Sequence, residues 1–199
     1  MSTDRARQRG LTLIELLMFI VIIGVALVAM LQVLRITTER SADPLRRKQA
    51  LMIAESLLEE VQLARFTWCD PSSENADSAA STAECGVPEK FGQALPEPAG
   101  PRPYDNINDY VAAADTPTAA FNNGDGQLAN ANGNALNIAG YSARLTITPA
   151  TLGAGAGAIV AAGTSADVDA LRISVEVTYD GDQKLVLDGY RTRYAPRYE

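Results

Sequence analysis

Apolar residues dominate the chain from residue 11 to residue 34, interrupted only by Thr12, Glu15, Gly24 and Gln32. A run of this length is enough to span a bilayer, which takes about 20 residues. Arginines at positions 5, 7 and 9 precede the run. Because basic residues stay on the cytoplasmic side, the pattern predicts a transmembrane helix over residues 11–35, with the rest of the chain across the membrane.

A different pattern follows over residues 36–66, where polar and apolar residues mix with a helical period. Asp43 can cap a helix and Pro44 can occupy its first position, so the pattern predicts a kink or a restart there. The apolar positions that we expect on one face of this amphipathic helix are Leu45, Leu51, Ala54, Leu57, Leu58, Val61 and Leu63.

The C-terminal part, residues 141–199, alternates apolar and polar positions with period two, which is typical of half-buried antiparallel strands. The residues expected to face inward are Tyr141, Ala143, Leu145, Ile147, Leu171, Ile173, Val175, Val177 and Tyr179. The sequence Asp180-Gly181-Asp182 predicts the turn to a last strand. A long N-terminal helix followed by a sheet places the chain in the α+β class.

Residues 67–140 are rich in Ser, Ala, Asn, Asp, Gly and Pro, and predict a long loop region. Cys69 and Cys85 both lie on the translocated side, where an oxidising compartment favours a disulfide over two free thiols. Trp68, beside Cys69, is expected to pack on that disulfide. With Tyr104 and Tyr110 it is also a candidate for an adhesive surface.

The formal net charge is −7, and the chain has no histidine. An acidic chain argues against nucleic acid and against an anionic membrane surface as partners. The missing histidine removes the commonest general base and zinc ligand. No phosphate-binding loop or pair of catalytic carboxylates stands out, so no enzyme activity and no cofactor are expected.

Two stretches of the loop region hold oxygen-bearing side chains that calcium accepts as ligands. Ordinary turns use the same residue types, so calcium is the lesser of the two interpretations. The first stretch, residues 104–110, holds Asp105, Asn106, Asn108 and Asp109, and the second, residues 121–128, holds Asn122, Asn123 and Asp125.

Glu15 is the one carboxylate within the apolar run. A charge there is costly, which favours a partner for it, although a residue near the membrane edge can also reach the headgroups. A secretory signal is disfavoured, because the uncharged core of residues 16–31 exceeds the usual 7–15 residues and no small-x-small cleavage site follows it.

The stretch RARQRGLTLIELL, residues 5–17, resembles the class III leader of type IV pilins and type II secretion pseudopilins. The resemblance implies a leader over residues 1–10, cleavage by prepilin peptidase between Gly10 and Leu11, and N-methylation of Leu11. It also implies that Glu15 pairs with the new amine of the same or an incoming subunit and so sets subunit register. Leucine at the first mature position departs mildly from the usual phenylalanine or methionine.

The segments SADPLRRKQALMIAESLLEE, YDNINDY and LVLDGYRTRY are similar to the minor pilin D family of the mannose-sensitive haemagglutinin (MSHA) pilus. This resemblance implies a type IV pilin-like roll and a minor pilin that acts in pilus assembly, initiation or tip decoration, and so in surface attachment.

The partners implied are major and minor pilins, the inner-membrane assembly platform and the membrane. The implied location is a single pass of the inner membrane with a periplasmic C-terminal domain, and then the pilus at the cell surface. A type II secretion minor pseudopilin and a membrane-anchored periplasmic binding domain remain alternatives.

Overall fold

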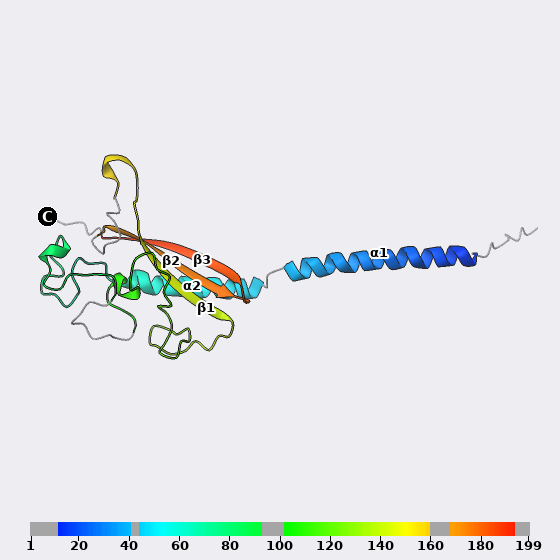
Figure 1. Cartoon of the computed structure of the whole chain (residues 1–199), viewed down its shortest axis with the longest axis horizontal. Coiled ribbons are helices and arrows are strands. Elements are labelled where there is room, and N and C mark those ends of the chain that lie inside the picture. The colour runs from blue at the N-terminus through cyan, green and yellow to red at the C-terminus, as the bar shows by residue number, and fades with distance from the viewer. Residues whose placement is uncertain (1–11, 41–43, 93–101, 160–167, 194–199) are drawn as a thin grey trace, which may run out of the picture. The chain divides into compact units, whose positions relative to one another are not determined.

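The computed structural model describes residues 12–40, 44–92, 102–159 and 168–193 (Figure 1). The chain divides into two units, Met1–Pro44 and Leu45–Glu199, which are described separately. The predicted leader, with Gly10 and Leu11, lies outside the described residues, as does Asp43.

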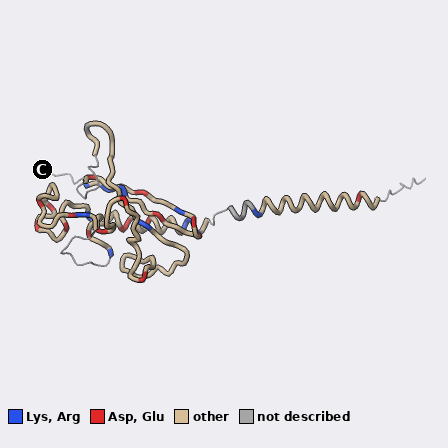
Figure 2. Tube along the Cα trace, in the orientation of Figure 1, with Lys and Arg blue, Asp and Glu red and all other residues tan. Residues whose placement is uncertain are grey.

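Helix α1, Leu13–Arg40, forms the described part of the first unit. Thr12 precedes it and accepts the backbone N–H groups of Glu15 and Leu16 on its carbonyl oxygen, at 3.1 and 3.2 Å. Between Glu15 and Arg35 the helix has no charged residue (Figure 2). Side chains from residue 12 to residue 35 are all exposed, so no described residue of this unit covers the apolar surface of the helix.

Helix α2, Pro44–Leu63, begins at the proline that the sequence predicted for its first position. Its buried residues recur with helical spacing and are Ala50, Ala54, Leu57, Leu58 and Val61. Three positions predicted for this face are wrong: Leu45, Leu51 and Leu63 are 61%, 37% and 77% exposed. Leu45 and Leu63 each lie nine residues from Ala54, about two and a half turns, and therefore on the opposite side of the helix.

Three antiparallel strands form a sheet in the order β1-β2-β3, with bounds Tyr141–Pro149, Ala170–Tyr179 and Gln183–Thr192. The α+β class predicted from the sequence is confirmed. The predicted inward positions of the first two strands are buried, except that Tyr141 is half-buried. Asp180 and Gly181 take φ values of 49° and 83° in the β2–β3 turn, a conformation that glycine adopts without strain.

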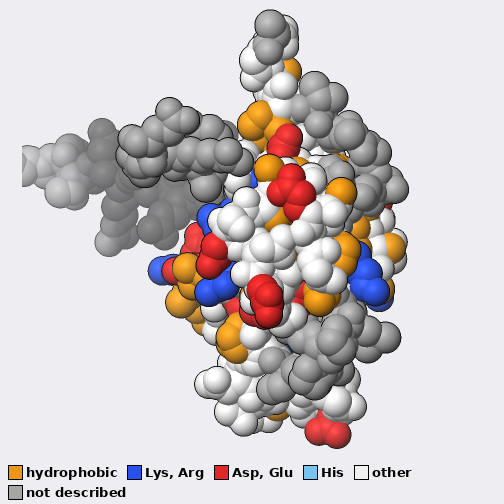
Figure 3. All heavy atoms as spheres, turned by 90° about the vertical axis from the view of Figure 1, so that its left-hand side faces the viewer, with side chains coloured by type: hydrophobic (Ala, Val, Ile, Leu, Met, Phe, Trp, Pro, Cys, Tyr) orange, Lys and Arg blue, Asp and Glu red, His pale blue; other side chains and the backbone are white. Residues whose placement is uncertain are grey.

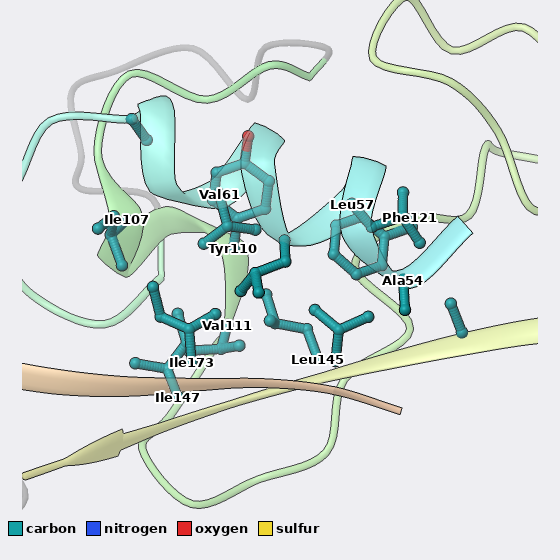
Figure 4. Close-up of a cluster of buried hydrophobic side chains, with 14 of the residues drawn as sticks. Ala54, Leu57, Val61, Ile107, Tyr110, Val111, Phe121, Leu145, Ile147 and Ile173 are labelled. Atoms are coloured by element: carbon teal, nitrogen blue, oxygen red, sulfur yellow. The ribbon is translucent and has the colours of Figure 1, made fainter. Parts of the chain in front are cut away.

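The core of the second unit lies between α2 and the sheet (Figure 4). Leu57 and Val61 of α2 face Leu145 of β1 and Ile173 of β2 across this layer. The loop region also fills it, through the buried side chains of Ile107, Tyr110, Val111 and Phe121. The predicted loop region is therefore irregular in backbone but part of the core.

Close approach of α2 to β3 explains the one buried glycine of that strand. A Cβ atom added to Gly189 would meet the Leu58 and Gln62 side chains of α2. At the start of α2, Arg46 forms an ion pair of 2.8 Å with Asp180 of the β2–β3 turn. These contacts fix the helix along the sheet.

Candidate functional site

The first candidate site is the start of α1. Thr12 and Glu15 have the spacing of a capping box, and Thr12 Oγ1 accepts the Glu15 backbone N–H at 3.4 Å. An acidic side chain in the first helical turn is also favoured by the helix dipole. The position of Glu15 in the first turn thus gives its carboxylate a local electrostatic explanation, which the sequence analysis missed although the Thr-x-x-Glu pattern could have revealed it.

The rest of α1 has the dimensions of a membrane anchor. Leu13–Arg35, 23 residues, is long and apolar enough to cross a bilayer, and none of it is buried. The helix presents apolar side chains on every side, with Glu15 at one end and Arg35 at the other. In water such a surface is unfavourable, so α1 requires lipid or other apolar helices around it.

The second candidate region is the loop closed by a disulfide between Cys69 and Cys85. The face of the globular unit that carries this loop shows apolar side chains scattered among acidic, basic and uncharged ones (Figure 3). Trp68 is half-buried, and the Arg193 guanidinium lies 4.0 Å from the centre of its ring and 3.9 Å from that of Phe66. The contact that holds the Trp68 ring in the structure is thus its cation–π interaction with Arg193.

The proposed adhesive surface is not formed by Tyr110, which is only 2% exposed. Its ring meets that of Tyr104 edge-on at 4.8 Å, and its hydroxyl donates to Glu60 Oε1 at 3.2 Å. Burial and the neighbouring Glu60 carboxylate raise the pKa of Tyr110 above its ordinary value. Arg102 lies 3.6 Å from the same carboxylate, which joins α2 to the loop region.

The first group of calcium candidates lies around the short 3₁₀ helix η2, Ile107–Tyr110. Asp105 is exposed, whereas Asn106, Asn108 and Asp109 are buried. Asp109 Oδ2 accepts the backbone N–H of Asn106 at 3.1 Å, so this carboxylate orders the turn. The side-chain amide of Asn108 has no hydrogen-bond partner on either its oxygen or its nitrogen.

The second group lies in an exposed hairpin. Asn123 Oδ1 accepts the backbone N–H groups of Asp125 and Gln127 at 3.1 and 3.0 Å, which is ordinary turn chemistry. Asn122 and Asp125 are exposed. Across the described ranges, no group of three or more His, Cys, Asp or Glu side chains is placed to hold a metal ion.

Two further carboxylates, which the sequence analysis did not select, are buried near η2. Asp70 is fully buried and Glu89 is 3% exposed. Burial raises the pKa of Glu89 to about 8, and the carboxylates of Asp109, Asp70 and Asp105 act in the same direction, against a lowering by the backbone N–H of Lys90. No local pattern in the sequence marks these two residues as buried.

A groove runs along the exposed side of α2. It has a volume of about 1030 Å³ and apolar walls that include Met52, Leu63, Tyr104, Leu136 and Ile138. Met52 and Leu63 are 60% and 77% exposed.

Residues 5–31 match the prokaryotic N-terminal methylation motif. The matched range contains Gly10, Leu11 and Glu15 together with most of the apolar part of α1. This match supports a type IV pilin-like or pseudopilin protein. A leader of this type implies processing by prepilin peptidase and association with pilins at the membrane. No curated protein and no solved structure matches the chain.

Proposed function

We propose that the protein is a structural subunit of a type IV pilus-like filament, stored in the inner membrane and then assembled. The observation that carries this proposal is the methylation motif over residues 5–31, which runs directly into a helix whose apolar side chains are all exposed. One helix of this kind suits both a bilayer and the interior of a helical filament. A folded α+β unit follows it, as in a subunit that displays a globular domain outside the membrane.

Within that class we assign the protein to the minor pilins of an MSHA-like pilus, with a role in assembly, initiation or tip decoration and thus in attachment. The support is the resemblance of residues 41–60, 104–110 and 185–194 to minor pilin D of that system. The partners would be major and minor pilins and the inner-membrane assembly platform. The loop closed by Cys69 and Cys85 would face outward from the filament.

Glu15 would set subunit register in this filament. Cleavage between Gly10 and Leu11 creates an α-ammonium group four residues before this carboxylate. In an apolar surrounding, breaking such a pair costs about 3–5 kcal/mol. The carboxylate of Glu15, which lies in the first turn of α1, would thus pair with the amine of its own or an incoming subunit.

The decisive experiment is the N-terminal mass of the protein recovered from cells with and without prepilin peptidase. We expect a chain that begins at methylated Leu11 only when the peptidase is present. A chain that keeps residues 1–10 in both strains would leave a membrane-anchored periplasmic domain and refute the filament proposal.

Incorporation into the filament tests the role of Glu15. We expect Glu15→Ala to be processed but to be depleted from sheared filaments, whereas Glu55→Ala on the exposed side of α2 is incorporated normally. Wild-type incorporation of Glu15→Ala would refute the role of its carboxylate in subunit register. If the wild-type protein is recovered with type II secretion components rather than with pilus components, the pseudopilin alternative is favoured.

A further inference from the structure

The two outer strands of the sheet differ in what lies along their free edges. A segment of the loop region closes the edge of β1: Thr118 and Leu145 exchange both backbone hydrogen bonds at 2.8 Å, and Asp115 N donates to the Ile147 oxygen at 2.9 Å. Strand β3 forms the other border of the sheet (Figure 1), and no described residue pairs with its outer side. Its outer backbone groups are therefore open to a further strand.

Strand β3 also lacks most of the features that keep an edge strand from pairing. Such features are short length, proline, bulges and charged side chains, lysine above all. β3 has ten residues without a proline, and its register with β2 is unbroken from Gln183 to Thr192. Its charged residues are Lys184, Asp188 and Arg191. The edge is thus long and regular, and its charges decide what can pair with it.

The hydrogen bonds at the end of the sheet show which residues of β3 direct their backbone outward. Arg193, which follows β3, donates its backbone N–H to the oxygen of Asp169, which precedes β2, at 2.8 Å. Residues of an antiparallel strand bond alternately to one side and the other, so the odd-numbered residues of β3 bond to β2. The even-numbered residues therefore direct their N–H and C=O groups to the free edge. These include Lys184, Val186, Asp188 and Tyr190.

The even-numbered side chains of β3 also lie on the face of the sheet away from α2. A Cβ atom on Gly189 would meet side chains of α2, so the odd-numbered positions face the helix and the even-numbered ones face away. Val186 and Tyr190 are accordingly 55% and 54% exposed. On the same face, Lys184 forms an ion pair of 2.9 Å with Glu176 of β2. The edge thus carries exposed apolar side chains with charged ones between and beside them.

An antiparallel copy of β3 fits this edge in one register. With a two-fold axis at Val186, each Lys184 lies opposite the second copy's Asp188, so this pair of opposite charges occurs twice. Opposite charges directly across an antiparallel pair are stabilising, and like charges are destabilising. An axis at Asp188 or at Lys184 would oppose like charges, and an axis at Leu185 or Leu187 would give neither charge an opposite partner. The charge pattern therefore selects the register centred on Val186.

The path of α2 leaves space for the second copy. Near its start the helix lies at β1, where the Tyr141 hydroxyl donates to Gln49 Oε1 at 2.7 Å, and its last turns lie against Gly189 of β3. The helix therefore crosses the sheet diagonally and covers one end of β3. Because a two-fold axis reverses the strand direction, the covered end of one copy would lie beside the uncovered end of the other.

We propose that the free edge of β3 is a self-association surface, on which β3 of a second copy of this chain pairs antiparallel about Val186. The two three-stranded sheets would then form one continuous sheet. The exposed Val186 side chains would lie side by side at the axis, flanked by two contacts between Lys184 and Asp188. A two-fold pair is closed, whereas filaments arise from head-to-tail contacts, so this surface does not rest on the filament proposal.

The first test introduces single cysteines into the full chain, purified in nonionic detergent, oxidised mildly and analysed on a non-reducing gel. The two native cysteines form an internal disulfide, so an introduced cysteine is the one free thiol. Hydrogen-bonded partners lie about 5.5 Å apart between Cα atoms, which a disulfide can bridge. Val186→Cys should therefore give a disulfide-linked dimer.

Tyr190→Cys is the matched control, because Tyr190 is as exposed as Val186 on the same face of the same strand. In the proposed pair the two copies of residue 190 would lie about 26 Å apart, too far for a disulfide. Tyr190→Cys should therefore remain monomeric on the gel. Absence of a dimer from Val186→Cys, or equal dimer yields from both variants, would overturn the proposal.

Charge variants test the register independently, through the dimer dissociation constant measured by sedimentation in detergent. Lys184→Glu and Asp188→Lys should each weaken association by about tenfold, because each places like charges opposite one another. The double variant Lys184→Glu/Asp188→Lys restores opposite charges and should associate as the wild type does. Lys90→Glu, an exposed change outside the strand, controls for net charge and should also match the wild type.

Association through α1 would not respond to these charge changes. Failure of the double variant to recover, an equal loss in Lys90→Glu, or unchanged association of both single variants would each refute pairing through β3. If a charge variant does not fold, the comparison of the two cysteine variants still decides the question.

Discussion

Helix α1 and the globular unit contain the same apolar residue types, but these side chains are exposed in α1 and buried in the core of the globular unit. Leu27 of α1 is 55% exposed, whereas Leu145 of β1 is fully buried. The globular unit supplies its own apolar partners, whereas α1 must obtain them from lipid or from other subunits.

The largest expected effect contrasts these two leucines directly. Leu145→Ala should lower the free energy of unfolding of the globular unit by about 2–5 kcal/mol, because it leaves a cavity in the core. Leu27→Ala should change it by less than about 0.5 kcal/mol. Urea unfolding of the full chain in detergent, followed by the fluorescence of Trp68, the one tryptophan, measures both. Equal effects of the two variants would contradict the comparison.

Removal of the disulfide should have the second-largest effect on the free energy of unfolding. The double variant Cys69→Ser/Cys85→Ser should lose about 3 kcal/mol, because the unfolded chain regains the entropy of a loop with 15 intervening residues. The same urea titration measures the loss, and the dithiothreitol-treated wild type serves as the control. A variant as stable as the oxidised wild type would show that the disulfide does not constrain the unfolded chain.

The pH dependence of stability tests the buried carboxylates of the globular unit. The pKa of Glu89 is raised to about 8 in the folded state, so between pH 4.5 and 8 the folded state holds a proton that the unfolded state has lost. Stability from this group is present at low pH and is lost as pH rises through that window. The wild type should lose about 3 kcal/mol of unfolding free energy between pH 5 and pH 8.

Glu89→Gln provides the comparison for this pH effect, because it keeps the shape of the side chain and removes its titration. Its unfolding free energy should vary much less with pH than that of the wild type. If both proteins show the same pH profile, the titrating group lies elsewhere.

The smallest expected effect is at the junction of α2 and the β2–β3 turn. Arg46→Ala should cost at most about 1 kcal/mol, because the ion pair with Asp180 is partly exposed. Asp180→Ala and the double variant complete a cycle that isolates the pair. A coupling energy well above that of an exposed pair would show that this contact fixes the position of α2.

The elements were largely predictable because their patterns are local. The buried positions of β2 follow strict alternation from Leu171 to Tyr179. Pro44 marks the first position of α2, and the motif around Glu15 lies in one continuous stretch. The boundaries predicted for the leader and the other divisions stay predictions, as does the role of Leu11.

It was harder to predict which face of an element is buried and which side chains contact one another. Leu45 and Leu63 are as apolar as Leu57 but lie on the other side of α2. Tyr110 was a candidate for the surface and is instead buried beneath α2, where its hydroxyl donates a hydrogen bond to Glu60. Apolarity alone does not say which side of an element the rest of the chain will cover.

The sequence by itself determined that the chain has an apolar helix with a processing motif, an amphipathic helix and alternating strands. Each of these follows from the order of neighbouring residues along the backbone. Only the tertiary structure placed the three separate segments that carry Asp70, Glu89 and Asn106 side by side. Burial and the pKa of a carboxylate depend on neighbours in space, which the order of residues does not specify.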